Sequence, residues 1–390
     1  MSSSTPANSS PELMQKKILD NILNNDTVFR NPWWQQAPLA IDPTIIEQAQ
    51  AHQNSLTKPQ GSLGAIEDIA IRLAGIQQKT MPSIDNVGIY VFAADHGIME
   101  EGVSAFPQAV TAEMLKNFVS GGAAISVLSK NLNADLIVVN VGSLADENEL
   151  PAVVHRVINK SSGNIAKEPA MNQQQFEQAM TVGSEMAENA RFHHQHLFVG
   201  GEMGIGNTSV ASALICHFTE NKAENIVGPG TGLDVAGIQH KQQVVDQAIT
   251  THKASIHCPE DALICLGGFE IVALVGAYIR AAQLGIAILV DGFICTAAAL
   301  AATRLNPEVA PYLFYCHQSA EPGHQAALTA LNAKPLLDLQ LRLGEGSGAA
   351  LAVPLFKLAV ALHNNMATFA EASVSDATAS DTEADTTTSN

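Results

Sequence analysis

Apolar residues occur along the chain in short blocks that are separated by longer, mixed stretches. Short runs rich in Val, Ile and Leu predict strands at 87–94, 134–141, 196–199, 262–266, 286–290 and 311–315. Ala-rich stretches between and after these runs predict helices at 109–129, 174–193, 208–217, 234–253, 269–284 and 323–333. The alternation of short strands with longer helices is typical of βαβ units, so we predict an α/β fold with a parallel sheet.

The two ends of the chain do not follow this alternation. Residues 41–78 have a helical pattern, which the turn-like sequence KPQGSLG (58–64) interrupts, and a last helix is predicted at 348–364. No linker rich in Pro or Ser divides the middle of the chain. We therefore expect four parts: a disordered start (1–10), a small helical domain from both ends (11–80 with 336–370), an α/β catalytic domain (81–335) and a disordered acidic tail (371–390).

Composition limits the kinds of partner. The 390 residues include 20 Lys and Arg against 38 Asp and Glu, which gives a formal net charge of −18. Broad binding to nucleic acid or to an anionic membrane needs clustered cations, so neither is expected, although one local cationic pocket for a phosphate is compatible with this charge. The five cysteines form no C-x-x-C pair and the start MSSSTPANSS lacks the pattern of a secretory signal, so we expect a cytoplasmic protein.

Glycines and polar residues gather directly after the predicted strands. Because ligands of open α/β sheets bind outside the carboxyl ends of the strands, these clusters predict one active-site rim. Any single cluster is better explained by an ordinary turn between a strand and a helix, but six clusters on one edge favour a binding site. The clusters are Asp95 to Gly97, Gly142 and Ser143, Gly200 to Glu202, Gly267 and Gly268, Asp291 and Gly292, and His317 and Gln318.

Two glycine-rich segments each lead into a predicted helix. In GGEMGIGNTSVASAL (200–214), Gly204 and Gly206 stand directly before Asn207, which can begin the helix. Such a segment can hold a small phosphate against the positive end of the helix, or it can be a plain turn. Its spacing matches neither the dinucleotide fingerprint nor a P-loop.

The second segment, GPGTGLD (228–234), has the same character and contains Gly230 and Gly232. Lys241 follows about two helical turns later, where its ammonium group could neutralise a phosphate. A solvated surface lysine is the ordinary alternative.

One glutamate stands between glycines. In LRLGEGSGAAL (341–351), Glu345 lies between an apolar run and a helix. A carboxylate in a tight, partly apolar turn can act as a general base, because burial raises its pKa toward neutrality. Capping of the helix or simple exposure are the alternatives.

The segment 91–111 contains several acids and one histidine, but no second histidine at ligand spacing, so we expect no metal. Ser104 and Gln108 of this segment could instead line a pocket for a flat polar aromatic. A G-x-S-x-G sequence, the mark of a serine hydrolase, is missing from the chain.

Taken together, seven ordered segments between about 58 and 351 resemble one family. This is the family of nicotinate-nucleotide–dimethylbenzimidazole phosphoribosyltransferases, which serve the lower-ligand branch of cobalamin synthesis. The matching segments are KPQGSLG (58–64), ADHGIMEEGVSAFPQAVT (94–111), GEMGIGNTS (201–209), GPGTGLD (228–234), LVDGFICTAAAL (289–300), CHQSAEPGH (316–324) and LRLGEGSGAAL (341–351).

The resemblance implies a reaction in which nicotinate mononucleotide gives its 5-phosphoribosyl group to 5,6-dimethylbenzimidazole. It also implies a homodimer, a Rossmann-like sheet with a small domain from both chain ends, and no cofactor. Glu345 would be the general base. The phosphoribosyl and nicotinate side would be bound by Glu202, Gly204, Gly206, Asn207, Gly230, Gly232, Lys241, Asp291 and Ser319, and the benzimidazole by Ser104, Gln108 and Leu343.

Two other functions remain open on the sequence. A protein on the same scaffold could bind or sense a nucleotide without turning it over, or it could hydrolyse the nucleotide. The presence of Glu345 within GEGSG favours chemistry over sensing, because a binding protein has no need of a base there. A buried slot for a second aromatic would favour transfer over hydrolysis.

Overall fold

The computed structural model describes residues 32–375. The predicted disordered start, residues 11–31 and the acidic tail from 376 onward lie outside the described residues. The chain divides into a short unit, Met1–Gln36, and a large one, Ala37–Asn390. The described part of the short unit holds a 3₁₀ helix, η1 (Trp33–Gln35). All other elements belong to the large unit.

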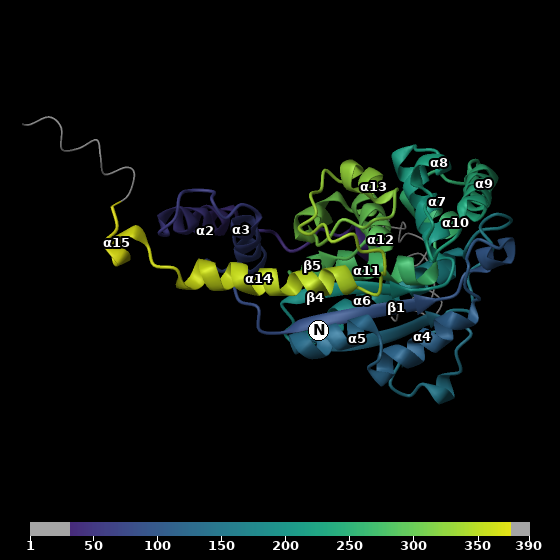
Figure 1. Ribbon diagram of the computed structural model, residues 1–390, viewed down its shortest axis with the longest axis horizontal. Helices are drawn as coiled ribbons and strands as arrows, with labels where there is room; N and C mark the ends of the chain where they lie inside the picture. The colour runs from purple at the N-terminus through teal and green to yellow at the C-terminus, as the bar shows by residue number, and fades with distance from the viewer. Residues whose placement is uncertain (1–31, 376–390) are drawn as a thin grey trace, which may run out of the picture. The chain divides into compact units, whose positions relative to one another are not determined.

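Six parallel strands form one sheet in the order β3-β2-β1-β4-β5-β6 (Figure 1). Every residue of the central strand β1 is buried, as expected for a strand covered on both faces. The α/β fold with a parallel sheet, predicted from the sequence, is confirmed. The strands are β1 (Val87–Ala94), β2 (Asp135–Gly142), β3 (Val154–His155), β4 (Leu197–Met203), β5 (Ala287–Val290) and β6 (Leu313–Tyr315).

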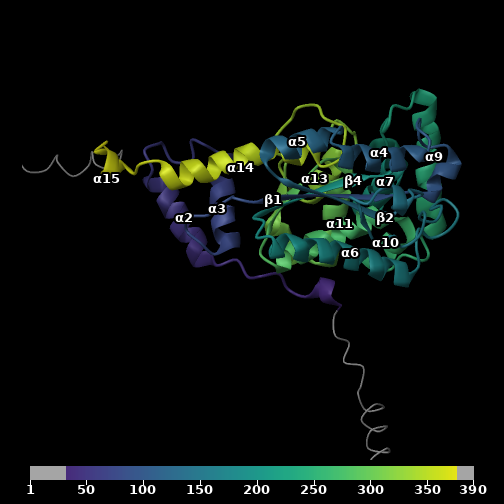
Figure 2. The same ribbon diagram turned by 90° about the horizontal axis from the view of Figure 1, so that it is seen from below.

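Helices cover both faces of the sheet. Figure 2 shows α6 and α11 on one face and α4, α5 and α14 on the other. The α helices are α2 (Pro43–Ser55), α3 (Ala65–Gln77), α4 (Ala109–Ser120), α5 (Ala124–Leu132), α6 (Gln173–Phe192), α7 (Asn207–Thr219), α8 (Ala223–Ile226), α9 (Val235–His252), α10 (Pro259–Leu266), α11 (Phe269–Gln283), α12 (Phe293–Leu305), α13 (His324–Ala330), α14 (Ser347–Asn365) and α15 (Phe369–Ala372). Three 3₁₀ helices complete the large unit: η2 (Gly97–Glu101), η3 (Glu147–Glu149) and η4 (Pro307–Tyr312).

Helices α6 and α11 approach each other closely at two glycines. A Cβ atom at Gly183 would lie 1.9 Å from the Ala273 carbonyl oxygen, and one at Gly276 would lie 2.3 Å from the Met180 carbonyl oxygen. Helix backbones can approach this closely only where side chains are absent. The glycine pair therefore fixes how α6 packs on α11, which in turn packs on the sheet.

Segments from the two ends of the chain lie side by side. Helix α3 packs against α2 and α14, and the small cluster between α2 and α3 contains buried Ala49, Ile71 and Ala74. Arg72 of α3 reaches the β6 edge of the sheet, where its Nη2 donates to the carbonyl oxygens of Pro311 (3.0 Å) and Leu313 (2.7 Å). Its guanidinium also lies 3.8 Å from the centre of the Phe314 ring.

Helix α14 is the one helix of the described chain that is long and apolar enough to cross a membrane by length and composition. Its most apolar window is 56% buried inside the protein. Such burial is usual for a core helix that packs against a sheet.

Two predicted elements differ in kind or number from the structure. Residues 262–266, predicted as a strand, belong to helix α10, which begins with Pro259, Glu260 and Asp261. A short apolar run cannot be assigned by periodicity alone, and the Pro and acids at its start are helix-initiating signals. The predicted helix 109–129 is two helices, because α4 ends at Gly121 with φ 84°. The two-residue strand β3 was not predicted.

Candidate active site

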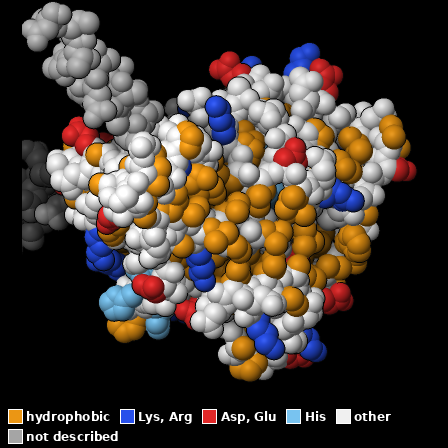
Figure 3. Space-filling view, turned by 60° about the vertical axis from the view of Figure 1, so that its left-hand side comes forward, with side chains coloured by type: hydrophobic (Ala, Val, Ile, Leu, Met, Phe, Trp, Pro, Cys, Tyr) orange, Lys and Arg blue, Asp and Glu red, His pale blue; other side chains and the backbone are white. Residues whose placement is uncertain are grey.

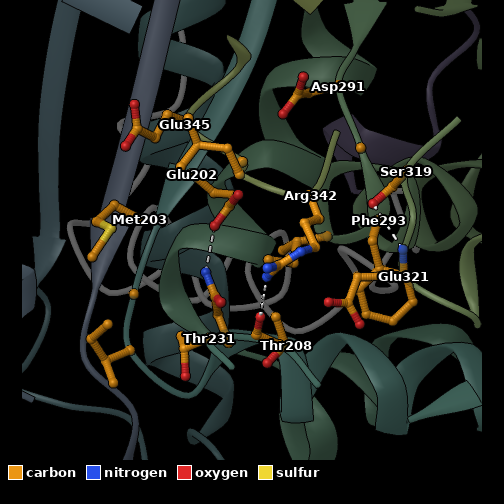
Figure 4. A pocket seen from close by; sticks show the side chains of 18 of the residues that line it. Glu202, Met203, Thr208, Thr231, Asp291, Phe293, Ser319, Glu321, Arg342 and Glu345 are labelled. Atoms are coloured by element: carbon orange, nitrogen blue, oxygen red, sulfur yellow. Dashed lines mark hydrogen bonds between the residues drawn. The ribbon is translucent and has the colours of Figure 1, made fainter. Parts of the chain in front are cut away.

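A cavity of about 420 Å³ opens at the carboxyl ends of the strands (Figure 4). Its walls come from the end of β4, the segments after β5 and β6, the loop before α14, and the starts of α4 and α7. The position agrees with the rim predicted from the sequence, although Gly267 and Gly268 follow helix α10 and not a strand. The lining residues are Phe106, Val110, Met114, Glu202 to Ile205, Asn207, Thr208, Gly230, Thr231, Asp291 to Ile294, His317, Ser319, Glu321 and Arg342 to Glu345.

Three consecutive residues before α14 have a left-handed backbone. Their φ angles are 89° at Gly344, 65° at Glu345 and 85° at Gly346. Non-glycine residues seldom adopt this conformation, and such strain is concentrated at functional sites. The turn, which we call the GEG turn (344–346), is pressed onto the end of β4. A Cβ atom at Gly201 would lie 2.4 Å from the Glu345 carbonyl oxygen.

The GEG turn directs the Glu345 carboxyl group toward the first turn of α5. The backbone N–H of Ile125 lies 3.5 Å from Glu345 Oε2. Burial raises the pKa of Glu345, the Ile125 N–H opposes this, and the negative charge of Asp291 adds to the rise. Glu345, which is 6% exposed, therefore has the burial and the raised pKa of a general base.

Glu202 is the second carboxyl group of the cavity. It is buried at the end of β4 and accepts a hydrogen bond from the Asn207 side chain. Burial raises the pKa of Glu202 to about 8, with further contributions from the negative charges of Asp291 and Glu270. Glu202 is therefore protonated at neutral pH and can donate a hydrogen bond to a bound hydroxyl group.

The two glycine segments meet beside the start of α7. The backbone at Gly206 has φ 101° and leads directly into the helix at Asn207. Lys241, from α9, is 1% exposed and donates from Nζ to Thr208 Oγ1 (2.8 Å). Burial lowers the pKa of Lys241 to about 8. A helix N-terminus and a buried ammonium group together favour an anion here.

Gly230 separates Lys241 from the cavity. A Cβ atom at Gly230 would lie 3.0 Å from Lys241 Nζ, and the backbone there has φ 52°. On the cavity side, Arg342 Nη1 donates to the Gly230 carbonyl oxygen at 3.4 Å. Because Gly230 has no side chain, Lys241 and Arg342 can both lie close to its backbone.

The residues predicted from the sequence fall into two groups. Eight of them line the cavity: Glu202, Gly204, Asn207, Gly230, Asp291, Ser319, Leu343 and Glu345. Five lie outside the lining: Ser104, Gln108, Gly206, Gly232 and Lys241.

Some of this second group lie directly behind the lining. Ser104 Oγ is 2.9 Å from Thr231 Oγ1, and Thr231 lines the cavity. Lys241 donates a hydrogen bond to Thr208, which lines the cavity. A side chain at Gly232 would meet nothing within 4 Å.

Several lining residues were not named among the expected substrate-binding residues, although His317 stood in one of the predicted rim clusters. His317, Glu321 and Arg342 carry charge or a ring nitrogen, and Phe106, Met114 and Phe293 supply apolar surface. The three polar residues lie inside sequence segments that had already been singled out. The scarcity of cations along the chain was a usable signal for Arg342, since it stands three residues before Glu345.

Between residues 32 and 375, no group of three or more His, Cys, Asp or Glu side chains is arranged to hold a metal ion.

The family model described as a phosphoribosyltransferase matches residues 39–374. The chain belongs to this phosphoribosyltransferase family. Two relatives from strains of Pseudomonas putida are 53% and 54% identical to it over 344 residues, which is 88% of this chain and 98% of each relative. Both are named nicotinate-nucleotide–dimethylbenzimidazole phosphoribosyltransferase.

Solved structures of the phosphoribosyltransferase family agree with the fold. A crystal structure of CobT from Thermus thermophilus has a TM-score of 0.81 and 40% sequence identity, and the match covers 85% of this chain and 99% of that one. A second structure from the same organism, titled as the same kind of phosphoribosyltransferase as the Pseudomonas relatives, has a TM-score of 0.81 and 39% identity, with 86% and 100% coverage.

Proposed function

We propose that the enzyme transfers the 5-phosphoribosyl group of nicotinate mononucleotide to 5,6-dimethylbenzimidazole, which gives α-ribazole 5′-phosphate and nicotinate. The observation that carries this proposal is the placement of Glu345. Its strained turn presents a buried carboxyl group of raised pKa at a cavity that has an anion-favouring side and an apolar side. A transferase of this kind needs all three features.

The reaction needs one base and no metal. Glu345 takes the proton from the N–H of the benzimidazole while the other ring nitrogen attacks C1′ of the ribose. The bond between C1′ and the pyridinium nitrogen breaks, and its electron pair stays with nicotinate, whose ring becomes neutral. No general acid is needed, because the leaving group is cationic before it departs. A carboxylate in the cavity also stabilises the positive charge that develops at C1′.

The polar side of the cavity is assigned to the nucleotide. The N-terminus of α7 and Lys241 are placed to bind the phosphate, with Gly204, Gly206, Gly230 and Gly232 as the surrounding backbone. Protonated Glu202 would donate to a ribose hydroxyl. Asn207, Asp291 and Ser319 complete this side of the cavity.

The apolar side is assigned to the acceptor. Phe106, Met114 and Leu343 supply apolar surface to the cavity that Glu345 also lines. Ser104 and Gln108 would hold the polar edge of the ring. A slot of this kind excludes water, which favours transfer over hydrolysis.

We also propose that the enzyme acts in the cytoplasm as a homodimer, and that α2, α3 and the end of α14 form a small domain. The proposed dimer interface is supported by exposed apolar side chains on α5 and α14. These are Val127, Leu351 and Leu358. One face of the molecule carries a broad area of hydrophobic side chains, with charged residues mostly at its margins (Figure 3).

The test is an assay of the purified enzyme with nicotinate mononucleotide, with and without 5,6-dimethylbenzimidazole, in which both products are followed by mass-resolved chromatography. We expect ribotide only when the benzimidazole is present, and little or none with Glu345→Ala. Glu177→Ala, an exposed acid on α6, is the control and should retain activity. Nicotinate released without acceptor would indicate a hydrolase, and binding without either product would indicate a nucleotide sensor.

A further inference from the structure

The carboxyl group of Asp291 is engaged by the protein backbone. Its Oδ2 accepts from the N–H of Gly346 (3.2 Å) and its Oδ1 from the N–H of Ala349 (2.8 Å). These N–H groups belong to the first turn of α14, where the N-cap residue itself offers no side chain. Asp291, 1% exposed at the end of β5, therefore caps α14 from a different element.

Asp291 is in turn held by His317. His317 Nε2 lies 3.4 Å from Asp291 Oδ1, and both side chains are buried. The imidazole ring is fixed between two glycines, since a Cβ atom at Gly292 or at Gly348 would lie 2.9 Å or less from it. Burial alone lowers the pKa of His317, but the adjacent Asp291 outweighs this effect and the pKa is raised.

The hydrogen bond from Gly346 to Asp291 lies one residue after Glu345, the proposed base. The Gly346 N–H that Asp291 accepts belongs to the GEG turn, in which three consecutive residues have positive φ. A strained backbone persists only where the surrounding structure holds it in place. Asp291 is the side chain that bonds to the C-terminal end of this turn.

We propose that Asp291 is a positioning residue for Glu345, and that His317 keeps its carboxylate in place. Together they would hold the GEG turn in the conformation that aims the Glu345 carboxyl group at the acceptor. This assignment differs from a direct contact between Asp291 and the substrate. It rests on the proposed function for its kinetic consequences, but its structural consequence can be measured independently.

The structural test is hydrogen exchange at the Gly346 and Ala349 amides. In Asp291→Asn, the side-chain oxygen can still accept a hydrogen bond but the NH₂ group cannot, so one of the two backbone N–H groups loses its partner. Because hydrogen bonds to charged groups are worth about 1.5–3 kcal/mol, exchange there should be faster by roughly 10- to 100-fold if it proceeds by local opening. Asp95→Asn is the matched control, since Asp95 is also buried after a strand and accepts from the Leu144 N–H (2.9 Å). It should leave exchange in α14 unchanged.

The kinetic test separates positioning from substrate contact. For Asp291→Asn we expect kcat to fall about 10- to 100-fold while the KM for nicotinate mononucleotide changes by less than about threefold, because misplacement affects the reacting geometry. The charged and titratable groups that line the cavity with Glu345 are Glu202 in β4, Asp291 after β5, His317 and Glu321 after β6, and Arg342 in its own loop. The N-terminus of α5 faces the Glu345 carboxyl group. Removing the Asp291 charge should therefore shift the acidic limb of the kcat profile to lower pH.

His317→Gln is the second variant, and it keeps the proposal testable if Asp291→Asn does not fold. We expect kcat to fall while the KM for nicotinate mononucleotide changes little, and exchange at Ala349 to be faster. Both effects should be smaller than in Asp291→Asn. Unchanged exchange at Gly346 and Ala349 would overturn the proposal, and so would a large rise in KM with kcat intact. If the wild-type enzyme forms no ribotide, the proposed function fails, and the exchange measurement still decides whether Asp291 anchors the turn.

Discussion

At the scale of single residues, the cavity brings together carboxyl groups in different environments. Glu202 is neutral at pH 7, because burial and neighbouring charges raise its pKa to about 8. Asp291 accepts hydrogen bonds from two backbone N–H groups and lies beside His317. Pairs of titratable groups with divergent environments are typical of sites where one group donates a proton and another accepts one.

The rate of the reaction should depend on the ionised form of Glu345. Glu345→Gln removes the proton acceptor and keeps the shape, so we expect kcat to fall by about 10²- to 10⁴-fold with a KM for the nucleotide within about threefold of wild type. In the wild type, kcat should rise with pH through the raised pKa of Glu345, because only the carboxylate can take the proton. Steady-state kinetics from pH 4.5 to 8 will check both points. A variant with an unchanged rate would assign the base to another group.

Protonation of Glu202 should make the free energy of unfolding depend on pH. Its pKa is about 8 in the folded enzyme and 4.5 is its ordinary value, so between these limits the folded state holds a proton that the unfolded state has lost. Stability should therefore decline as pH rises from about 4.5 to 8. Glu202→Gln removes this decline, and at pH 8 it should be more stable than wild type by as much as a few kcal/mol. Urea titrations at pH 5 and pH 8 will show whether the difference grows with pH, and equal differences at both would contradict the raised pKa.

At the scale of elements, the strands and most helices could be predicted because their patterns are strong. The fully buried β1 and the 20-residue α6 agree with their predicted positions within one residue. The prediction of a strand at 262–266 was wrong, because five apolar residues suit a buried helix as well as a buried strand. The separation of α4 from α5 depended on the left-handed Gly121, which a periodic pattern does not reveal.

The site could be predicted only in part, because a sequence pattern reveals residue types but not the contacts between distant segments. Glycines and acids beside predicted strands or helices identified Glu345, Glu202 and Asp291 as site residues. That Asp291 bonds to the backbone of α14 could not be predicted, since that contact joins residues far apart in the sequence. The position of Lys241 behind Gly230, and not in the cavity wall, likewise depends on how α9 packs.

Of the contacts between helices, the one between α6 and α11 should be the most sensitive to added side-chain volume. Gly276→Ala places a methyl group 2.3 Å from the Met180 carbonyl oxygen, so one helix must move, and we expect a loss of about 1–3 kcal/mol in the free energy of unfolding. Gly237→Ala in α9 is the matched control, because its nearest neighbours are side-chain atoms of Leu233. It should be neutral or stabilising by up to about 1 kcal/mol, since alanine favours helix. Equal losses from both variants would show that close backbone contact is not the cause.

At the scale of the whole molecule, segments from both ends of the chain are tied to the sheet. Helix α14 begins at the GEG turn and runs 19 residues to the contact with α3. Arg72 of α3 makes its own connection to the β6 edge. The active site and the terminal helices are thus joined both through α14 and through the far side of the sheet.

Arg72 should contribute to the stability of this arrangement. Arg72→Met keeps much of the apolar stem but removes two hydrogen bonds to carbonyl oxygens and the contact with Phe314, so we expect a loss of about 2–4 kcal/mol. Limited proteolysis should then cleave the region 37–82 faster than in wild type. Arg156→Met is a matched control, because its ion pair with Glu185 is exposed and worth little. If both variants lose the same stability, the connection through Arg72 is not important.

The left-handed backbone at Glu345 also limits which sequences this enzyme can reach by mutation. The chemistry requires a carboxylate, whereas the backbone favours Gly, Asn or Asp, so Asp is the residue type that suits both, and Glu supplies the carboxylate against the backbone preference. Glu345→Asp suits the backbone better but shortens the side chain by one methylene, which should leave a well-folded and poorly active protein. In a library of variants at this position, selection for folding and selection for activity would therefore retain different residues.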